Sequence, residues 1–596
     1  MGLETKMRLV LAVMITILVM MVASAFAADY YVATTGIDDT AAGRGQSFGD
    51  PWETITYALG HVSGSSSAPA IIHIAAGTYK DTTINNETFP LNMESYVSLS
   101  GEDEATTILD AEDGAYHVIY CYYVNNLTIE NLTITGGNAN GSTSPNYGGG
   151  GIYCESSSPT MTNCTVSGNS ANQGGGGICC GIYSSPTITN CTIAGNTTTS
   201  TGGAIHLYEN SSPMLTNCTI AGNTAKYEGG GVYSCNDSSP TLINCTITDN
   251  RASQIGGGGI RCYYTSATLK NCTVSGNTTY NRGGGIFCTS GSPTIDNCTL
   301  THNSASRGAG IHCYYYSSPV LRNCTIADNS ASQSDGGGGI YCDADCSPTV
   351  KNSILWGDTA NDVPDEISGP GTVTVTYCDV DQDGYAGSNH NIRRDPGFVP
   401  LDEDGNHTGY YLMHLGPQAN DSACIDAGDT NASVYGLETY TTRTDGTTDD
   451  GTVDMGYHYP EGYSGSDDTY IELLSFNAQP QGSAIALTWE TGAEIDNAGF
   501  IIYRRIAGTF YYQKVSDLIA AEGNASLGAS YSFTDSNVEA GVSYDYWLVD
   551  IDRSGKWTPH GPASARLPIR FDRLEIQFYR NSLEKPSYNR FTGWSQ

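Results

Sequence analysis

Basic side chains are scarce in this sequence. Its 596 residues include 26 Lys and Arg against 62 Asp and Glu, which gives a formal net charge of −36 at pH 7. Charged residues of both signs make up 15% of the chain, below the roughly 25% usual in soluble proteins. Because such an acidic chain repels phosphate backbones, we exclude nucleic acid as a partner.

Long hydrophobic runs are also rare. The one clear run, Leu9 to Ala23, follows Lys6 and Arg8 and precedes Ala25-Phe26-Ala27, which has the form of a signal-peptide cleavage site. The run is short for a membrane span, and no later segment is apolar enough to cross a bilayer. Residues 1–27 are therefore predicted to be a signal peptide, which implies secretion or a cell-surface location. An uncleaved N-terminal anchor is the alternative.

Long helices are opposed by the 71 glycines, and a repeat fills the middle of the chain. Between about Gly148 and Lys351 one phrase recurs: Gly-Gly-Gly-Ile-x-Cys, then Ser-Ser-Pro-Thr, then Asn-Cys-Thr-Ile-x-x-Asn. The Asn of Asn-Cys-Thr returns every 27 or 26 residues, at Asn163, Asn190, Asn217, Asn244, Asn271, Asn297 and Asn323. This period is short for helical repeats, and its alternating β-branched stretches are typical of strands. Three short strands and three turns per period predict one coil of a parallel β-helix.

Stacked coils place equivalent residues in columns about 4.8 Å apart. We expect the Asn of each Asn-Cys-Thr step to face the interior and bond to its equivalents above and below, because a lone buried Asn would be unsatisfied. That orientation argues against glycosylation at these sequons.

The 19 Cys mostly share such columns, and we interpret them as buried thiols, with stacked disulfides as the alternative. A second Asn column is expected at Asn169, Asn196, Asn223, Asn250, Asn277, Asn303 and Asn329, and a core column at Ile152, Ile178, Ile205, Val232, Ile260, Ile286, Ile311 and Ile340.

Over about residues 29–460 the chain resembles the right-handed parallel β-helices of the pectate-lyase-like superfamily. Its Gly-Gly-Gly-Ile phrases and aliphatic-x-x-Asn steps, such as Val166 to Asn169, are similar to chlamydial polymorphic outer-membrane protein repeats. The resemblance implies an all-β fold, with a right-handed parallel β-helix solenoid over 28–460. Residues 29–110 would begin the solenoid, and residues 353–460 would form a cap that hides the open edge of the last coil.

The pattern changes after a polar stretch at 461–469, which we interpret as a linker. Alternating strands, such as Ile485 to Trp489 and Tyr544 to Val549, predict a β-sandwich over 470–569. This segment resembles a fibronectin type III domain, with Trp489 as its core tryptophan and Tyr544 as its corner tyrosine. Residues 570–596 form a basic tail, which is either disordered or in contact with an acidic partner.

Two outward columns are the candidate binding surface. The residue between Ile and Cys in each Gly-Gly-Gly-Ile-x-Cys phrase should point outward, and so should the residue two positions later. Both columns are rich in aromatic side chains with a few acids, which suits stacking on sugar rings and hydrogen bonding to hydroxyls. We therefore predict a non-enzymatic protein that binds an extracellular polysaccharide or the surface of a host or neighbouring cell. The predicted binding residues are Tyr153, Glu155, His206, Tyr208, Tyr233, Arg261, Tyr263, Phe287, His312, Tyr314, Tyr341 and Asp343. The alternative is that these aromatics only stabilise the sheet.

A polysaccharide lyase or glycoside hydrolase on the same face is the alternative function, and a purely structural surface protein is a third. By the superfamily resemblance a lyase would use a basic residue beside calcium-binding carboxylates, and Arg261 is the best candidate for that base. Asp379, Asp381 and Asp383 begin a loop like that of an EF-hand and make calcium the one candidate cofactor. The alternative for these three is a set of acidic turn residues.

Overall fold

The computed structural model describes residues 27–80, 86–115, 117–141, 148–396, 398, 412, 422–442, 448–449, 451–458, 470–495, 497–507, 513–516, 519–521, 528–552 and 557–568. The predicted linker 461–469, the predicted tail 570–596 and all but the last residue of the predicted signal peptide lie outside the described residues. The chain divides into two compact units. The first contains residues up to 394 with 424–440 and 449–459, and the second contains 395–423, 441–448 and the residues from 460 onward. No described helix is long and apolar enough to span a membrane.

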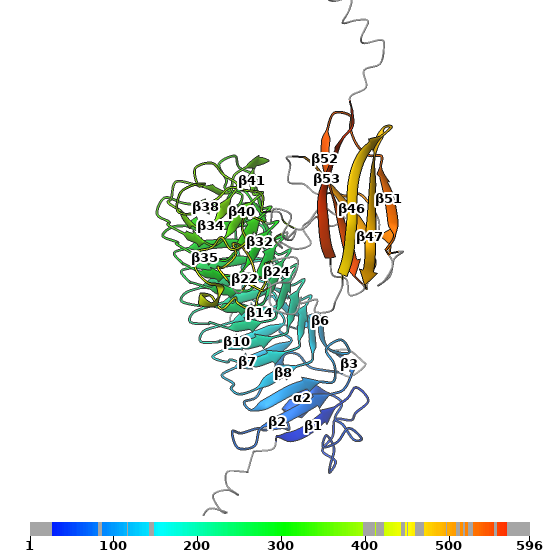
Figure 1. The fold of residues 1–596 in the computed structure, drawn as a ribbon. Coiled ribbons are helices and arrows are strands. Elements are labelled where there is room, and N and C mark those ends of the chain that lie inside the picture. Colours follow the sequence, from blue (N-terminus) through cyan, green and yellow to red (C-terminus); the bar gives the residue numbers. More distant parts are fainter. Residues whose placement is uncertain are drawn as a thin grey trace, which may run out of the picture. The chain divides into compact units, whose positions relative to one another are not determined.

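The first unit is a stack of coils in which each strand pairs in parallel with its equivalent one coil away (Figure 1). Sheet 1 has the order β1 (Ala28–Val32), β2 (Ala70–Ile74), β5 (Val97–Gly101), β8 (Thr128–Glu130), β11 (Thr160–Thr162), β15 (Thr187–Thr189), β19 (Met214–Thr216), β23 (Thr241–Ile243), β27 (Thr268–Lys270), β31 (Thr294–Asp296), β35 (Val320–Arg322), β39 (Thr349–Lys351) and β44 (Thr374–Thr376). Sheet 2 has the order β4 (Leu91–Asn92), β7 (Ile119–Tyr122), β10 (Ile152–Glu155), β14 (Ile178–Cys180), β18 (Ile205–Leu207), β22 (Val232–Cys235), β26 (Ile260–Tyr263), β30 (Ile286–Thr289), β34 (Ile311–Tyr314), β38 (Ile340–Cys342) and β43 (Ile367–Ser368).

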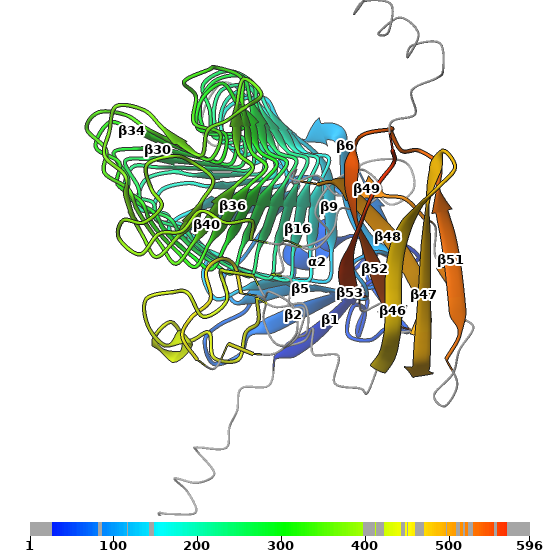
Figure 2. The ribbon, with the colours of Figure 1, turned by 45° about the horizontal axis from the view of Figure 1, so that its top comes forward.

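The third side of each coil consists of two short rows of strands, which superimpose coil on coil in Figure 2. Sheet 3 contains β3 (Gly77–Lys80), β6 (Thr107–Ala115), β9 (Thr133–Ala139), β12 (Thr165–Ser167), β16 (Thr192–Ala194), β20 (Thr219–Ala221), β24 (Thr246–Thr248), β28 (Thr273–Ser275), β32 (Thr299–Thr301), β36 (Thr325–Ala327), β40 (Ile354–Trp356) and β45 (Asp379–Val380). The second row contains β13 (Ser170–Ala171), β17 (Thr197–Thr198), β21 (Thr224–Ala225), β25 (Arg251–Ala252), β29 (Thr278–Thr279), β33 (Ser304–Ala305), β37 (Ser330–Ala331), β41 (Thr359–Ala360) and β42 (Val363–Pro364). Helical structure among the described residues is limited to α2 (Ile55–Leu59) and the 3-10 turn η1 (Ala432–Val434).

A continuous hydrophobic core fills the coils. In the three-residue strands of sheet 1 the central aliphatic residue is buried and its neighbours face outward, as in Thr187-Ile188-Thr189. Equivalent core residues pair in register, so that Ile193 lies beside Ile220 and Ile220 beside Ile247. The predicted core column from Ile152 to Ile340 is buried throughout. The predicted all-β parallel solenoid is therefore confirmed.

The second Asn column forms the expected interior ladder. Each of its side chains, from Asn169 to Asn329, is fully or almost fully buried. The Asn223 amide Nδ2 and the Asn223 backbone N–H both donate to Oδ1 of Asn250, at 2.9 and 3.0 Å. Asn250 in turn donates to Oδ1 of Asn277 and to the carbonyl oxygen of Ile220. Because each rung completes the hydrogen bonds of the previous one, the buried amides are satisfied along the whole column.

The first Asn column is a ladder too, but the prediction that it faces inward is wrong. Asn163, Asn190, Asn217 and Asn244 are exposed, although each Nδ2 still donates to Oδ1 of the preceding rung. The reason is the alternation of the chain, because the following Cys points inward and the Asn must take the opposite side. These Asn have φ near +50°, a left-handed conformation that Asn tolerates better than most residues. The burial argument against glycosylation therefore does not hold at these four positions.

All 19 cysteines are buried and free, which confirms their interpretation as thiols. Their sulfhydryls donate to carbonyl oxygens of neighbouring coils, as Cys218 Sγ does to Ile188 O at 3.4 Å. Burial raises the pKa of Cys324 and of Cys378 to about 12. These two thiols therefore stay protonated and behave as small core side chains.

Within the predicted cap, residues 354–380 still form strands of the coils, and residues 424–440 and 449–458 lie along the side of earlier coils. Asn271 donates to the hydroxyl of Tyr440, and Asn297 exchanges two hydrogen bonds with the backbone of His458. This segment thus covers the C-terminal half of the first Asn column. The amides there can bond to it because the ladder leaves some of their donors and acceptors unused.

The interior ladder ends in two carboxyl groups. Asn329 donates from its backbone and its side chain to Oδ1 of Asp358, at 2.7 and 2.8 Å, and the backbone N–H of Asp358 faces Oε2 of Glu366. Both acids are fully buried. Burial raises the pKa of Asp358 to about 7, and burial next to Asp358 raises that of Glu366 well above its usual range. The C-terminal end of the ladder is therefore most stable when these groups hold protons.

The second unit contains two antiparallel sheets around one core. One sheet is formed by β46 (Tyr470–Gln481), β47 (Ala484–Ile495) and β51 (Ser530–Asp535), and the other by β48 (Asn497–Ile506), β49 (Gln513–Lys514), β50 (Ile519–Ala520), β52 (Ser543–Asp552) and β53 (Trp557–Arg566). Trp489 of the first sheet stacks on Tyr531 and lies edge-on to Phe500 of the second. The Tyr544 hydroxyl accepts a hydrogen bond from the backbone N–H of Glu539.

We predict that Asn250→Ala lowers the free energy of unfolding by roughly 3–6 kcal/mol, because it leaves two buried N–H groups of Asn223 without an acceptor and opens a cavity. The matched control is Asn244→Gly on the exposed ladder, where glycine accepts the positive φ, and a change below about 1 kcal/mol is expected. Urea unfolding monitored by circular dichroism measures both. Equal losses in the two variants would contradict the assignment of the inner and outer ladders.

A second prediction concerns pH. A carboxyl whose pKa is raised on folding contributes most stability below its unfolded pKa, near 4, and loses that contribution as the pH rises through about 7. Asp358→Asn removes one ionisable group and adds an amide rung, so its midpoint of thermal unfolding should decrease less than that of the wild type between pH 5 and pH 8. Asp237→Asn, which changes an exposed carboxylate, should follow the wild type. Parallel pH curves for wild type and Asp358→Asn would contradict the account.

Candidate functional site

The first outward column of sheet 2 is covered, so the prediction that it is exposed is wrong. Six of its side chains are at most 9% exposed, namely Tyr153, Tyr233, Arg261, Phe287, His312 and Tyr341. His206 is half-buried. The column is covered by the glycine-bearing loops that precede the strands of sheet 2. These loops also pair from coil to coil through parallel backbone bridges, which link Gly174, Thr201, Glu228, Gly256, Arg282 and Arg307. At Gly174 an added Cβ would lie 2.3 Å from the His206 ring, so glycine lets this loop pack directly on the column.

The two histidines of this column are uncharged structural groups. Burial lowers the pKa of His206 to about 4, and its Nδ1 lies 3.0 Å from the Thr201 hydroxyl. Burial also lowers the pKa of His312, although Asp343 Oδ2 lies 3.0 Å from its Nε2. His312 does not reach solvent, and the lowered pKa of the half-buried His206 keeps it uncharged, so neither imidazole suits proton transfer to a polymer on the surface.

Arg261 is enclosed in the same way. Its Nε donates to Glu228 at 2.8 Å, its Nη1 donates to the carbonyl oxygen of Cys262, and its guanidinium lies 4.0 Å from the centre of the Phe287 ring. The side chain is 3% exposed. Such an arginine is a buried ion-pair partner, and its position does not suit the base of a lyase.

The second outward column is accessible. Tyr208 is exposed, and Glu155, Tyr263, Tyr314 and Asp343 are half-buried. These five residues and His206 of the first column are the members of the predicted set that the structure leaves at least partly accessible. They continue directly into the turn that follows each strand of sheet 2.

That turn carries exposed tyrosines that the sequence reasoning missed. We call the whole row the tyrosine edge; it comprises Tyr122, Tyr123, Tyr183, Tyr208, Tyr263, Tyr264, Tyr314, Tyr315 and Tyr316. Tyr123, Tyr183 and Tyr316 are 62–65% exposed. The adjacent Tyr-Tyr doublets were the available signal, but the predicted surface ended with the strand.

Five tyrosines of the edge have an unfavourable backbone conformation. The φ angles of Tyr123, Tyr183, Tyr264, Tyr315 and Tyr316 lie between +49° and +60°. A left-handed conformation costs roughly 1–2 kcal/mol for a side chain of this kind. In other coils the same position holds Asn210 or Ser290, which are smaller side chains. Strained, exposed aromatic residues at a position that accepts Asn indicate a role other than stability.

The edge tyrosines support one another. Tyr122 and Tyr123 meet edge to face with ring centres 4.6 Å apart, and Tyr263 and Tyr264 do so at 4.7 Å. Tyr315 and Tyr316 meet at 4.9 Å. Each doublet therefore fixes the orientation of its more exposed ring.

The predicted calcium residues do not converge on one point. Asp381 and Asp383 both pair with Arg393, at 2.9 and 2.6 Å. Asp379 is buried and accepts hydrogen bonds from the backbone N–H of Arg394 and from Cys424 Sγ. The Arg393 guanidinium thus neutralises the two carboxylates that the EF-hand pattern predicts to bind a calcium ion.

Within the described residues, a different trio of acids has close carboxylates. The ligand oxygens of Asp426, Asp449 and Asp454 lie within 4.8 Å of one another. Asp449 Oδ2 accepts hydrogen bonds from His458 Nε2 and from the backbone N–H of Asp454, so these contacts hold together the segment beside the coils.

Comparison with known proteins supports the fold of the first unit. Residues 117–293 and 255–392 match the family model described as a right handed beta helix region. Residues 117–392 form a right-handed parallel β-helix. No curated protein matches the chain. The crystal structure of an Fn3-like protein from Clostridium thermocellum matches at 17% identity and a TM-score of 0.13, with 18% of this chain and 100% of that chain covered.

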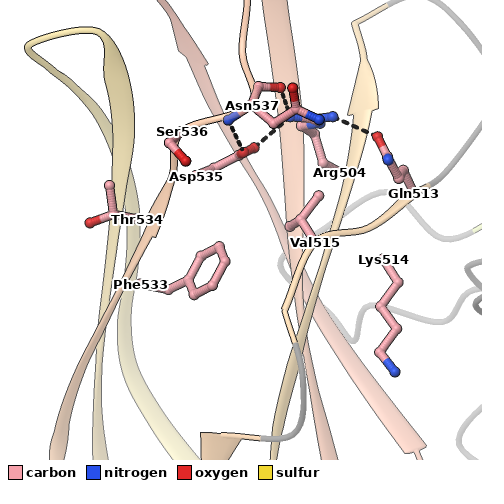
Figure 3. Close-up of a pocket in the computed structure, with 9 residues that line it drawn as sticks. All are labelled: Arg504, Gln513, Lys514, Val515, Phe533, Thr534, Asp535, Ser536 and Asn537. Carbon is pink, nitrogen blue, oxygen red and sulfur yellow. Dashed lines mark hydrogen bonds and ion pairs between the residues drawn. The ribbon is translucent and has the colours of Figure 1, made fainter.

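Apart from the β-helix, the second unit has a pocket lined by Arg504, Gln513, Lys514, Val515, Phe533, Thr534, Asp535, Ser536 and Asn537 (Figure 3). The Arg504 guanidinium already pairs with Asp535 at 2.7 Å and donates to Gln513 and Asn537. The Tyr546 hydroxyl donates to the same Asp535 oxygen. Because these polar groups bond to one another, the tyrosine edge is the better candidate site.

Proposed function

We propose that this is a secreted or cell-surface protein that binds carbohydrate through the tyrosine edge and does not act as an enzyme. The observation that carries the proposal is a row of exposed tyrosines held in strained conformations along one side of the β-helix. Flat phenol rings stack on the C–H faces of sugars, and the nearby carboxylates can accept hydrogen bonds from hydroxyl groups.

The N-terminal sequence and the second unit fit an extracellular location. The predicted signal peptide 1–27 would direct export. The strand orders β46-β47-β51 and β49-β48-β52-β53, with Trp489 in the shared core, support a β-sandwich of the fibronectin type III kind. We also assign the β-helix to the pectate-lyase-like superfamily on its repeat pattern. In this proposal the sandwich is a spacer or attachment module.

A lyase or hydrolase on the same face has less support. Its candidate base, Arg261, is buried in an ion pair, and two of the three predicted calcium residues, Asp381 and Asp383, pair with Arg393. A purely structural surface protein would not need strained tyrosines at exposed positions.

We predict that replacing Tyr183, Tyr264 and Tyr316 together by Asn weakens glycan binding at least tenfold, because stacking surfaces are lost, and leaves the unfolding midpoint unchanged or higher. Asn occupies the same position in another coil as Asn210, so the backbone should accept it. The measurement is a glycan array followed by titration of the strongest hit.

The matched control is Tyr280→Asn, which removes a tyrosine that is 71% exposed but lies outside the edge. It should bind like the wild type. Unchanged binding by the triple variant, or no glycan bound by the wild type, would refute the proposed function.

A further inference from the structure

The tyrosine edge also indicates what kind of carbohydrate it accepts, an inference that rests on the proposed function. We propose that the ligand is a linear, uncharged polysaccharide that lies parallel to the β-helix axis. The proposal follows from the charge of the edge and from the spacing of its tyrosines.

The chain segments of the edge carry acidic but no basic residues, although the half-buried Arg282 lies with its guanidinium 4.6 Å from the centre of the Tyr314 ring. The segments that form it in successive coils are 122–126, 155–158, 181–185, 208–212, 235–239, 263–266, 289–292, 314–318 and 343–347, and none contains Lys or Arg. They contain Glu155, Glu209, Asp237, Asp343 and Asp345, of which Asp237 and Asp345 are exposed. A carboxylated or sulfated glycan would meet like charges in four of these nine segments. An uncharged glycan can instead donate its hydroxyl hydrogens to the same carboxylates.

The left-handed positions of the edge stack coil by coil. The backbone N–H of Tyr123 donates to Glu155 O, and that of Ser156 donates to Ile182 O, so Tyr183 lies two coils beyond Tyr123. Tyr264 lies three coils further along the chain, and the next exposed pair, Tyr315 and Tyr316, follows after two more coils. At about 4.8 Å per coil the tyrosines in the left-handed position recur at steps of about 10, 14 and 10 Å along the axis.

These steps suit an extended chain of sugar rings. Stacking on every second or third ring leaves the intervening rings over the coils in which Ser156, Asn210, Asp237 and Ser290 hold the left-handed position, and Tyr208 adds a further ring in the coil of Asn210. A chain that crosses the axis would reach only one tyrosine cluster. A chain that follows the axis reaches all four, and its affinity should grow with its length.

The edge is ordered before a ligand arrives. The edge-to-face contacts of Tyr122 with Tyr123 and of Tyr263 with Tyr264 hold the outer rings in place. Binding a rigid linear chain to fixed platforms then costs little additional conformational entropy.

Calorimetric titration of the full chain after export tests the proposal. The probes are linear β-1,4-linked hexaoses and trioses of glucose, mannose, xylose and N-acetylglucosamine, together with the hexaose of galacturonic acid. We expect at least one neutral hexaose to bind at least tenfold more tightly than its own triose and than the acidic hexaose. Tyr264→Asn, at the middle of the row, should weaken the neutral hexaose about tenfold, and Tyr280→Asn should not.

A charge variant separates repulsion from lack of fit. Glu209→Gln combined with Asp237→Asn should strengthen binding of the galacturonic acid hexaose and should not strengthen binding of the neutral hexaose, which loses two carboxylate acceptors. Tighter binding of the acidic than of the neutral hexaose, or equal binding of triose and hexaose, would overturn this inference while leaving glycan binding intact. Retention of a protein partner without any glycan would overturn the inference and the proposed function together.

Discussion

The hydrogen bonds between buried Asn side chains of successive coils are the constraint on which this structure depends. An amide in a hydrophobic core must find partners for its donors and its acceptor, and here the partners are the same residue one coil away. One Asn must therefore return at the same interior position in each repeat. Where the series stops, at Asp358, the chain supplies carboxyl groups that accept the last amide hydrogens.

The same stacking aligns equivalent residues of successive coils in a row along the axis. A tyrosine in a single turn is an isolated side chain, but tyrosines in the equivalent turn of several coils form a row parallel to the axis. Cysteines in the core, Asn on the outer ladder and glycines in the covering loops line up for the same reason. A solenoid of this kind is suited to ligands that are themselves long and repetitive.

The repeat made much of the fold predictable, since an interval of 27 or 26 residues with β-branched alternation defines the coil, the core column and the buried thiols. It was harder to predict which residues face the interior of the coil and which face its surface. The first Asn column was assigned to the interior because its amides needed partners, yet Asn163 and its equivalents satisfy one another on the surface beside an inward Cys. The burial of Tyr153 and Phe287 depends on loops from elsewhere in the coil, which strand alternation does not describe. The calcium pattern at Asp381 could not reveal that Arg393 would fold back onto it.

The distance between equivalent positions tests the central claim most directly. Because the native thiols are buried, cysteines introduced at outward-facing positions of sheet 1 can carry spin labels selectively. Pulsed electron resonance would be measured for labels at 160 and 268, at 160 and 294, and at 128 and 294. Coils stacked in register along one axis predict backbone separations of about 19, 24 and 29 Å. Separations that do not grow by one coil spacing per repeat would contradict the stacked columns. They would also contradict the Asn ladders and the tyrosine edge, which depend on that stacking.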